Sequence, residues 1–167
     1  MFYDQIRIPV ERIGVLVGKK GETKRSIERK TGIKMKISKD GLVLIRCEDN
    51  LQVFISAAIV KSIGRGFNPD IAITLIKDNI SLEIINLKGA VRSEKKIRII
   101  RSRIIGTEGK AWKNIERLTG VHISVYGNTV AIIGESENVV VVKGAIEKLI
   151  HGSTHANVYK YIERRKK

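Results

Sequence analysis

Two short glycine-rich segments contain the residues of this chain that are best suited to contact a ligand. Gly18-Lys19-Lys20-Gly21 and Gly106-Thr107-Glu108-Gly109 share the pattern Gly-x-x-Gly and begin 88 positions apart. Glycines allow a backbone to approach a ligand closely. A helix that begins after such a loop turns its first N–H groups and the positive end of its dipole toward a phosphate. We therefore interpret the two segments as clamps for the phosphodiester backbone of a nucleic acid.

The residues that follow the two loops repeat as well. The repeated pairs are Ile27 and Ile115, Glu28 and Glu116, Thr31 and Thr119, Gly32 and Gly120, Ile33 and Val121, and Ile37 and Val125. A single Gly-x-x-Gly is often an ordinary tight turn, but two copies with matched flanks favour one supersecondary unit built twice.

The two copies differ in charge. Residues 18–30 hold six basic and two acidic side chains, whereas residues 106–118 hold three basic and two acidic ones. Since Glu108 should repel a phosphate, the second loop either binds more weakly or is compensated by its neighbours. The residues predicted to contact RNA are Gly18, Lys19, Lys20, Gly21, Lys24, Arg25, Arg101, Arg103, Gly106, Thr107, Glu108, Gly109, Lys110 and Trp112.

The bases of a bound single strand are expected to lie in an apolar groove beside each loop. The predicted groove residues are Ile13, Val17, Ile27, Ile33 and Met35 in the first copy and Ile105, Ile115, Val121 and Ile123 in the second. Trp112 replaces Lys24 of the first copy, and it either stacks on a base or packs beside Ile115 on the same helix face. The combined change Gly18→Asp and Gly106→Asp is expected to abolish RNA binding and to leave the fold intact.

Hydrophobic periodicity places each loop between two helices of an α+β unit. The pattern predicts helix 22–31, strands 33–37 and 42–47, and a helix capped by Asp49 or Asn50, and it predicts the same order again after residue 80. Residues 139–142 have strand propensity, but the repeat favours a helix over 136–150. Each unit should form a three-stranded sheet with helices packed on one face. The expected organisation is domain 1–66, a connecting helix 67–79, domain 80–152 and a basic C-terminal helix or tail 153–167.

Composition narrows the class of partner. The net charge is +15 over 167 residues, which favours a polyanion, first nucleic acid and second an anionic membrane surface. The chain has no apolar run long enough to span a bilayer and no secretory signal, so we expect a cytoplasmic protein. Cys47 is the single cysteine and is expected to be a buried thiol. His151 and His155 have no third ligand nearby, and we expect no metal, no cofactor and no catalytic residues.

The order strand, helix, Gly-x-x-Gly, helix, strand, strand, helix resembles the type I KH domain, a module that binds RNA and single-stranded DNA. The resemblance rests on the isoleucine six residues after each loop and on the Thr-Gly before the next strand. The tandem arrangement, the segment 123–134 and the chain end around His151–His155 resemble archaeal relatives of the "partner of Nob one" family of ribosome assembly factors.

This resemblance implies that the chain binds single-stranded RNA near the 3′ end of small-subunit ribosomal RNA and assists its maturation without enzymatic activity. It also implies work beside the endonuclease that cuts this end, an association with the alpha subunit of translation initiation factor two, and RNA contact through the second unit. Two alternatives remain open. One is a general regulator that binds single-stranded RNA or DNA. The other is a protein scaffold that docks a nuclease or an initiation factor, which the lower charge of the second segment favours.

Overall fold

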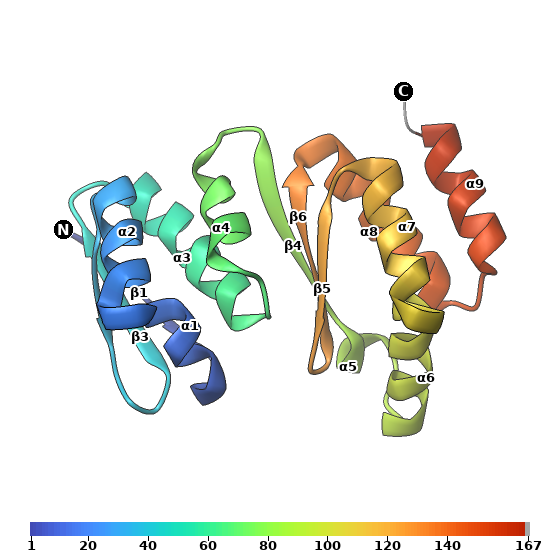
Figure 1. Ribbon diagram of the computed structural model, residues 1–167, viewed down its shortest axis with the longest axis horizontal. Coiled ribbons are helices and arrows are strands. Elements are labelled where there is room, and N and C mark those ends of the chain that lie inside the picture. Colours follow the sequence, from blue (N-terminus) through green and yellow to red (C-terminus); the bar gives the residue numbers. More distant parts are fainter. Residues whose placement is uncertain (166–167) are drawn as a thin grey trace. The chain divides into compact units, whose positions relative to one another are not determined.

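The protein folds into two compact units, Met1–Asp78 and Asn79–Lys167. The computed structural model describes residues 1–165, so Lys166 and Lys167 of the predicted basic tail lie outside the described residues. Each unit contains an antiparallel three-stranded sheet with helices on one face (Figure 1). This architecture confirms the predicted fold class.

Unit 1 has the strand order β1-β3-β2. Its elements are β1 (Phe2–Arg7), η1 (Val10–Arg12), α1 (Ile13–Val17), η2 (Lys19–Gly21), α2 (Glu22–Thr31), β2 (Lys34–Ile37), β3 (Leu42–Cys47), α3 (Asn50–Gly64), α4 (Pro69–Ala72) and η3 (Ile73–Ile76). Asp49 caps α3 as predicted, because its carboxylate accepts a hydrogen bond from the N–H of Leu51 at 2.9 Å. The predicted connecting segment belongs to this unit, where Ala72 and Leu75 are buried.

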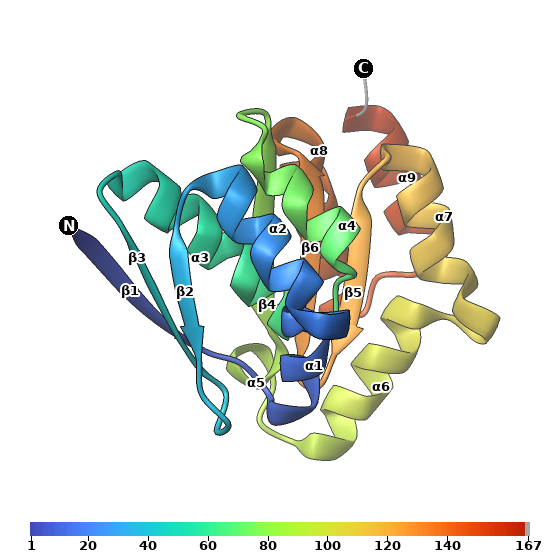
Figure 2. The ribbon, with the colours of Figure 1, turned by 60° about the vertical axis from the view of Figure 1, so that its left-hand side comes forward.

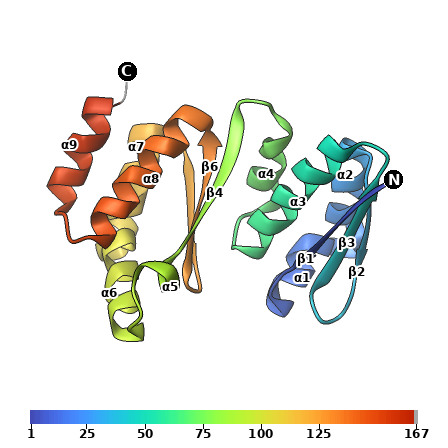
Figure 3. The same cartoon turned by 180° about the vertical axis from the view of Figure 1, so that it is seen from behind.

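Unit 2 has the equivalent strand order β4-β6-β5. Its elements are β4 (Ile80–Asn86), α5 (Leu87–Ala90), α6 (Glu94–Ile105), η4 (Thr107–Gly109), α7 (Lys110–Thr119), β5 (His122–Tyr126), β6 (Thr129–Glu135), α8 (Ser136–Ile150) and α9 (His155–Arg165). The helical prediction for residues 139–142 is confirmed. The short helix α5 has no counterpart among the predicted elements. Helix α9 packs beside α8, away from the sheet (Figure 3), and buries Val158 and Ile162.

The repeated Ile-Glu-x-x-Thr-Gly sequence has the same structural role in both units. The hydroxyl groups of Thr31 and Thr119 donate to the carbonyl oxygens four residues earlier, at 2.6 and 2.7 Å. Gly32 and Gly120 then end α2 and α7 in the left-handed conformation, with φ of 78° and 74°. A left-handed residue after the last helical turn is cheapest for glycine because it has no Cβ.

The repeated glutamates join each helix to the edge strand of its sheet. Glu28 accepts a hydrogen bond from the N–H of Met35 at 3.1 Å, and Glu116 accepts one from the N–H of Ile123 at 3.0 Å. These N–H groups lie on the unpaired side of β2 and β5, where strands leave backbone donors without a ladder partner. The glutamates therefore hold the helix after each glycine loop against the neighbouring strand.

The turn between β2 and β3 is held by Asp40. Its carboxylate accepts hydrogen bonds from the Ser38 hydroxyl and the Leu42 N–H, and it pairs with Arg7 at 3.1 Å. The bond from Ser38, followed by that from Arg7, lowers the pKa of Asp40 from 3.8 to about 2. The carboxylate therefore stays charged in any mildly acidic buffer and keeps Arg7 paired.

Candidate nucleic-acid interface

The two glycine loops have the same backbone conformation although their middle residues differ. At the first glycine, φ and ψ are 75° and 173° in Gly18 and 76° and 172° in Gly106. At the third residue they are 56° and 27° in Lys20 and 57° and 27° in Glu108. At the last glycine they are 76° and 15° in Gly21 and 75° and 13° in Gly109. Lys20 and Glu108 are the two non-glycine residues with positive φ among residues 1–165. The repeated feature is therefore a backbone shape, which two different middle sequences adopt.

The first glycine of each loop is packed tightly against the helix that follows. A Cβ placed on Gly18 would lie 2.2 Å from Thr23 Oγ1 and 2.8 Å from the Thr23 backbone nitrogen. A Cβ on Gly106 would lie 2.6 Å from Ala111 Cβ and 2.7 Å from the Ala111 nitrogen. No side chain fits at either position without displacing the helix. The expectation that aspartate at Gly18 and Gly106 leaves the fold intact is therefore wrong, because the added Cβ alone collides with backbone.

The middle side chains of both loops face solvent. Lys19, Lys20, Thr107 and Glu108 are exposed, and within residues 1–165 none of them makes a side-chain hydrogen bond or an ion pair. They are free to approach a phosphate that sits on the loop, and no partner would be lost if they were changed.

The order of the acidic and the basic residue is reversed between the two loops. Helix α2 begins with Glu22 after Lys20, whereas α7 begins with Lys110 after Glu108. The second loop thus has its cation in the first turn of the following helix and its anion at the tip. Lys110 is exposed and offsets part of the repulsion expected from Glu108. A weaker second loop remains a prediction.

The structure separates the two basic residues predicted beside the first loop. The Arg25 guanidinium reaches over Gly21, since its Nη1 would lie 2.9 Å from a Cβ on that glycine. Lys24 instead pairs with Glu28 at 3.4 Å. Arg25 is therefore placed at the loop, whereas the Lys24 ammonium lies along the helix, facing the edge of β2.

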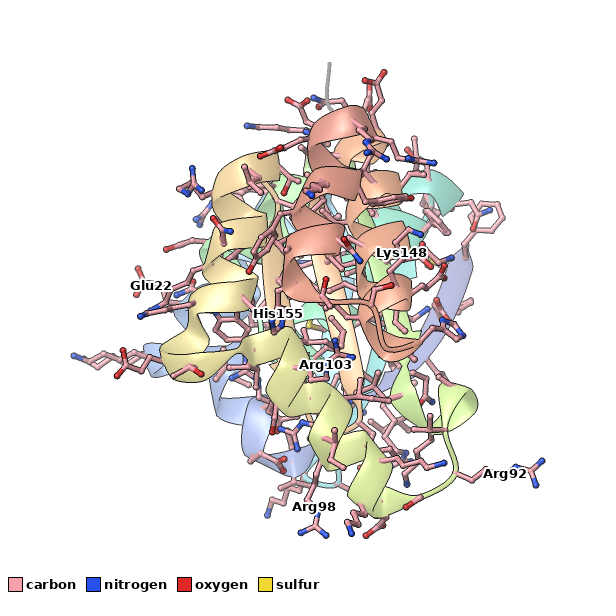
Figure 4. The ribbon with its side chains drawn as sticks, turned by 90° about the vertical axis from the view of Figure 1, so that its right-hand side faces the viewer. Glu22, Arg92, Arg98, Arg103, Lys148 and His155 are labelled. Atoms are coloured by element: carbon pink, nitrogen blue, oxygen red, sulfur yellow. The ribbon has the colours of Figure 1, made fainter. Side chains whose placement is uncertain are left out.

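Arg103 is a structural residue in unit 2. Its guanidinium donates to the carbonyl oxygens of Leu149, at 2.8 Å, and of Ser153, while the His155 ring nitrogen lies 2.7 Å from the Arg103 carbonyl oxygen (Figure 4). These contacts join the end of α6 to the end of α8 and the start of α9. Arg103 was predicted to steer RNA, but its charged group is occupied by backbone oxygens. Arg101 is half-buried, and its Nε has no hydrogen-bond partner among the described residues.

Replacing Arg103 by alanine is expected to lower the free energy of unfolding by about 2–3 kcal/mol, because two charge-assisted hydrogen bonds are lost and partly buried carbonyl groups are left unpaired. Arg98→Ala is the control, since Arg98 points into solvent near the other end of α6 (Figure 4) and should change stability by less than about 0.5 kcal/mol. Urea unfolding of both variants measures the difference. Equal stability of the two would contradict the structural role of Arg103.

The accessible part of the apolar groove is smaller than the sequence predicted. Ile27, Ile33, Ile115 and Val121 are at most 2% exposed, and Met35 and Ile123 are 4% and 6% exposed. These side chains face inward because the helices after the loops pack against the sheets, so the first four support the groove from below and are not available to a base. Ile13, Val17 and Ile105 are half-buried and reach the surface.

Helix α6 contributes three exposed residues, Lys95, Arg98 and Ile99, that the sequence prediction of the RNA site did not include. A depression of about 600 Å³ lies between this helix, the second loop and the start of α9. Ile99 is 51% exposed there, and Lys95 and Arg98 provide positive charge. The run of basic residues along α6 was the available signal in the sequence. The lining is Lys95, Arg98, Ile99, Ser102, Arg103, Gly106, Thr107 and His155.

Trp112 lies beside the second loop. Its Nε1 would be 3.6 Å from a Cβ on Gly109, and the side chain is half-buried. Close by on α7, a second depression of about 380 Å³ is lined by Lys110, Lys113, Asn114, Arg117 and Tyr159. The half-buried side chain fits both interpretations of Trp112, stacking on a base and packing on the helix face.

Within residues 1–165, the structure gives little support for a metal site or a membrane-spanning helix. No group of three or more His, Cys, Asp or Glu side chains could hold a metal ion there. The ring nitrogens of His151 and His155 each lie 2.7 Å from a backbone carbonyl oxygen. Cys47, expected to be buried, is half-exposed at the end of β3. No helix in the described residues is both long and apolar enough to cross a bilayer.

A three-stranded antiparallel sheet, helices on one face and an exposed Gly-x-x-Gly loop between two helices define a KH domain of type I, and this protein has two. Residues 81–167 match the model for the second KH domain of Pno1, described as a eukaryotic type KH-domain (KH-domain type I), and residues 3–60 match the KH domain model. The chain belongs to the Pno1-type branch of the type I KH family.

Known relatives support this assignment along most of the chain. A KH domain-containing protein of Methanocaldococcus jannaschii is 47% identical over 163 residues, which cover 95% of this chain and 72% of the relative. The pre-rRNA-processing protein pno1 of Aspergillus oryzae is 34% identical over 104 residues, covering 60% of this chain and 40% of that protein. In the crystal structure of the a/eIF2alpha–aDim2p–rRNA complex from Pyrococcus horikoshii, one chain matches with a TM-score of 0.91 and 44% identity, covering 99% of this chain and 94% of that one.

Proposed function

We propose that this protein binds single-stranded RNA through its two Gly-x-x-Gly loops and acts in the maturation of small-subunit ribosomal RNA, near its 3′ end. The observation that carries the proposal is the identical backbone shape of the two loops, each at the start of a helix, with exposed middle residues. The names of the relatives point to the same process, since one is a pre-rRNA-processing protein and another was crystallised with rRNA.

The geometry supports a binding role in which the backbone grips phosphates. Each loop presents glycine backbone and a helix N-terminus, a combination that favours anions without reading sequence. A KH loop of this kind clamps four nucleotides. In unit 1 the added charge comes from Lys19, Lys20 and Arg25, and in unit 2 it comes from Lys110. The half-buried Ile13, Val17 and Ile105 then offer apolar surface to the bases.

The proposed role is that of a non-enzymatic assembly factor. The partners we propose are the RNA itself, the alpha subunit of translation initiation factor two and the endonuclease that cuts the 3′ end. The initiation factor is supported by the related complex, which contains a/eIF2alpha together with rRNA. The endonuclease is proposed from the family resemblance alone.

The single tryptophan makes the central experiment direct. Titration with a 12-nucleotide RNA from the 3′ end of small-subunit rRNA is expected to change Trp112 fluorescence, because Trp112 lies beside the second loop. A DNA of the same sequence and an RNA of scrambled sequence serve as competitors at one fixed salt concentration. Equal competition by both would favour the general single-strand regulator. No measurable RNA binding, together with binding of a protein partner, would favour the scaffold.

A further inference from the structure

The sheet of unit 1 has an outer face that no other element of this unit covers (Figure 2). Strand register arranges the outward side chains in rows across the sheet. Tyr3 of β1 lies opposite Arg46 of β3, which lies opposite Lys34 of β2. In the next row, Leu44 of β3 lies between Gln5 and Lys36. The face therefore combines an aromatic ring, an apolar side chain and three cations.

These side chains are available to a ligand. Tyr3 is 70% exposed and Leu44 is 38% exposed, and Lys34, Lys36 and Arg46 are exposed as well. Within residues 1–165 none of the three cations makes an ion pair or a hydrogen bond through its side chain. Arg7, farther along β1, is different because it is paired with Asp40.

Unit 2 has no such face at the equivalent positions of its sheet. The row Tyr3, Arg46 and Lys34 corresponds to Leu82, Ile133 and His122, which occupy the matching register. This row contains two apolar side chains and no lysine or arginine. The basic aromatic surface is thus particular to unit 1 and is not a requirement of the fold.

The arrangement of charge on this face works against stability. Lys34 and Arg46 are direct cross-strand neighbours, and like charges in such a pair are destabilising. An anion that lies over such a row of cations relieves their mutual repulsion. This points to a polyanion as the occupant of the face.

The face is continuous with the region of the first glycine loop. A depression of about 600 Å³ extends from the outer face around the edge strand β2 to α2. On the α2 side it reaches Lys24 and Glu28, and Lys24 comes two residues after the start of the helix that follows the loop. Its lining residues are Tyr3, Lys24, Glu28, Lys34, Met35, Lys36, Leu44, Ile45 and Arg46.

We propose that a single RNA strand held by the first glycine loop continues around the edge of β2 and lies on the outer face of the unit 1 sheet. Lys34, Lys36 and Arg46 contact its phosphates, and Tyr3 stacks on a base. The inference rests on the proposed function, and it lengthens the RNA site of unit 1 beyond the four nucleotides that a KH loop clamps. An aromatic ring on an open basic sheet is a sequence-tolerant platform for single strands.

The test compares a 4-nucleotide and a 12-nucleotide single-stranded RNA over a series of salt concentrations. The sheet variant, which carries Lys34→Gln, Lys36→Gln and Arg46→Gln, should reduce the salt slope for the longer RNA by about 2, since each lost phosphate contact contributes about 0.7 for single strands. At 0.1 M salt this corresponds to an affinity loss of about 100-fold. Affinity for the 4-nucleotide RNA should change by less than about threefold, because that RNA fits within one loop.

Two controls keep the result specific. The variant Lys61→Gln, Lys77→Gln, Lys88→Gln removes the same charge from exposed positions that are not part of this sheet and should leave the slope for the longer RNA nearly unchanged. Tyr3→Phe should retain affinity and Tyr3→Leu should lose about fivefold or more, because only an aromatic ring stacks. The melting temperature of the sheet variant should be equal to or above that of the natural protein, since like-charge repulsion is removed.

The outcomes separate this inference from the proposed function. Absence of RNA binding by the natural protein would overturn the proposed function itself. Normal RNA binding with an unchanged salt slope in the sheet variant would overturn only the path over the sheet. In that case, loss of binding to an acidic protein partner by the same variant would assign the face to protein recognition.

Discussion

RNA affinity is expected to fall by about two orders of magnitude or more in a variant that carries Lys19→Asp, Lys20→Asp and Thr107→Asp. The first loop then loses two cations that can contact a phosphate, each worth about 1.5–3 kcal/mol as a charge-assisted hydrogen bond. Both loops become acidic at the point where the RNA backbone must approach. The fold should persist, because these side chains are exposed and have no partners in the described residues.

Aspartate is also compatible with the backbone at these positions. Lys20 has a φ of 56°, and aspartate is among the few non-glycine residues that adopt the left-handed region readily. Retention of the fold is checked by circular dichroism and thermal unfolding. The control variant carries Lys61→Asp and Lys77→Asp. It changes the net charge as much as the two substitutions in the first loop do, but at exposed positions outside the loops, and it should weaken RNA binding only modestly.

Variants of one loop at a time rank the two sites. If Lys19→Asp with Lys20→Asp removes more affinity than Thr107→Asp, the first loop provides the larger electrostatic part of binding. Undiminished affinity in the variant with both loops changed, measured at moderate salt, would rule out the glycine loops as the RNA site.

The second large effect is expected on stability. Gly106→Ala should lower the free energy of unfolding of unit 2 by about 2–5 kcal/mol, combining about 1–3 kcal/mol for overpacking with about 1–2 kcal/mol for alanine in the left-handed region. The overpacking arises because the new Cβ would lie 2.6 Å from Ala111 Cβ and 2.7 Å from the Ala111 nitrogen. Helix α7 must then move away from the loop.

Two other glycines provide matched controls for this effect. Gly109 and Gly120 have φ of 75° and 74°, but a Cβ on Gly109 meets nothing closer than 3.6 Å, and one on Gly120 meets no atom within 4 Å. Alanine at either position should cost about 1–2 kcal/mol, from the backbone conformation alone. Chemical unfolding of the three variants measures the difference, and an equal cost at all three would show that Gly106 is selected only by its φ.

Loss of RNA binding after a change at Gly106 therefore cannot be separated from damage to the fold, whereas a change at Thr107 or Glu108 can be read as an effect on binding.

Much of the fold could be predicted because its signals are local. Helix 22–31 and strand 42–47 were predicted with the observed bounds. Asp49 caps the helix that it was expected to cap, since a cap involves only residues two or three positions apart, and Asn68 and Ser93 cap α4 and α6 in the same way. Ser136 begins α8 but does not cap it. Its hydroxyl donates instead to the carbonyl oxygen of Asn79, a partner far away in the sequence.

The site was predicted less completely because several of its features depend on distant contacts. Arg103 was assigned to RNA from its type and its position before the loop. Its real partners, Leu149 and Ser153, are about fifty residues away. Ile27 and Ile115 were expected to line the groove. The helices rotate them fully inward against the sheet, and periodicity alone does not say how far a helix face is covered.

By itself, the sequence determined the presence of two Gly-x-x-Gly loops, the helices that follow them and the excess of positive charge, because glycine placement, caps and composition act over a few residues. Only the tertiary structure decided that both loops have one backbone shape, that Arg103 holds helices together and that Lys34, Arg46 and Tyr3 form one row. Residues from three strands become neighbours through register. Register depends on how the buried faces of the paired strands and the turns between them match, so one strand considered alone does not determine it.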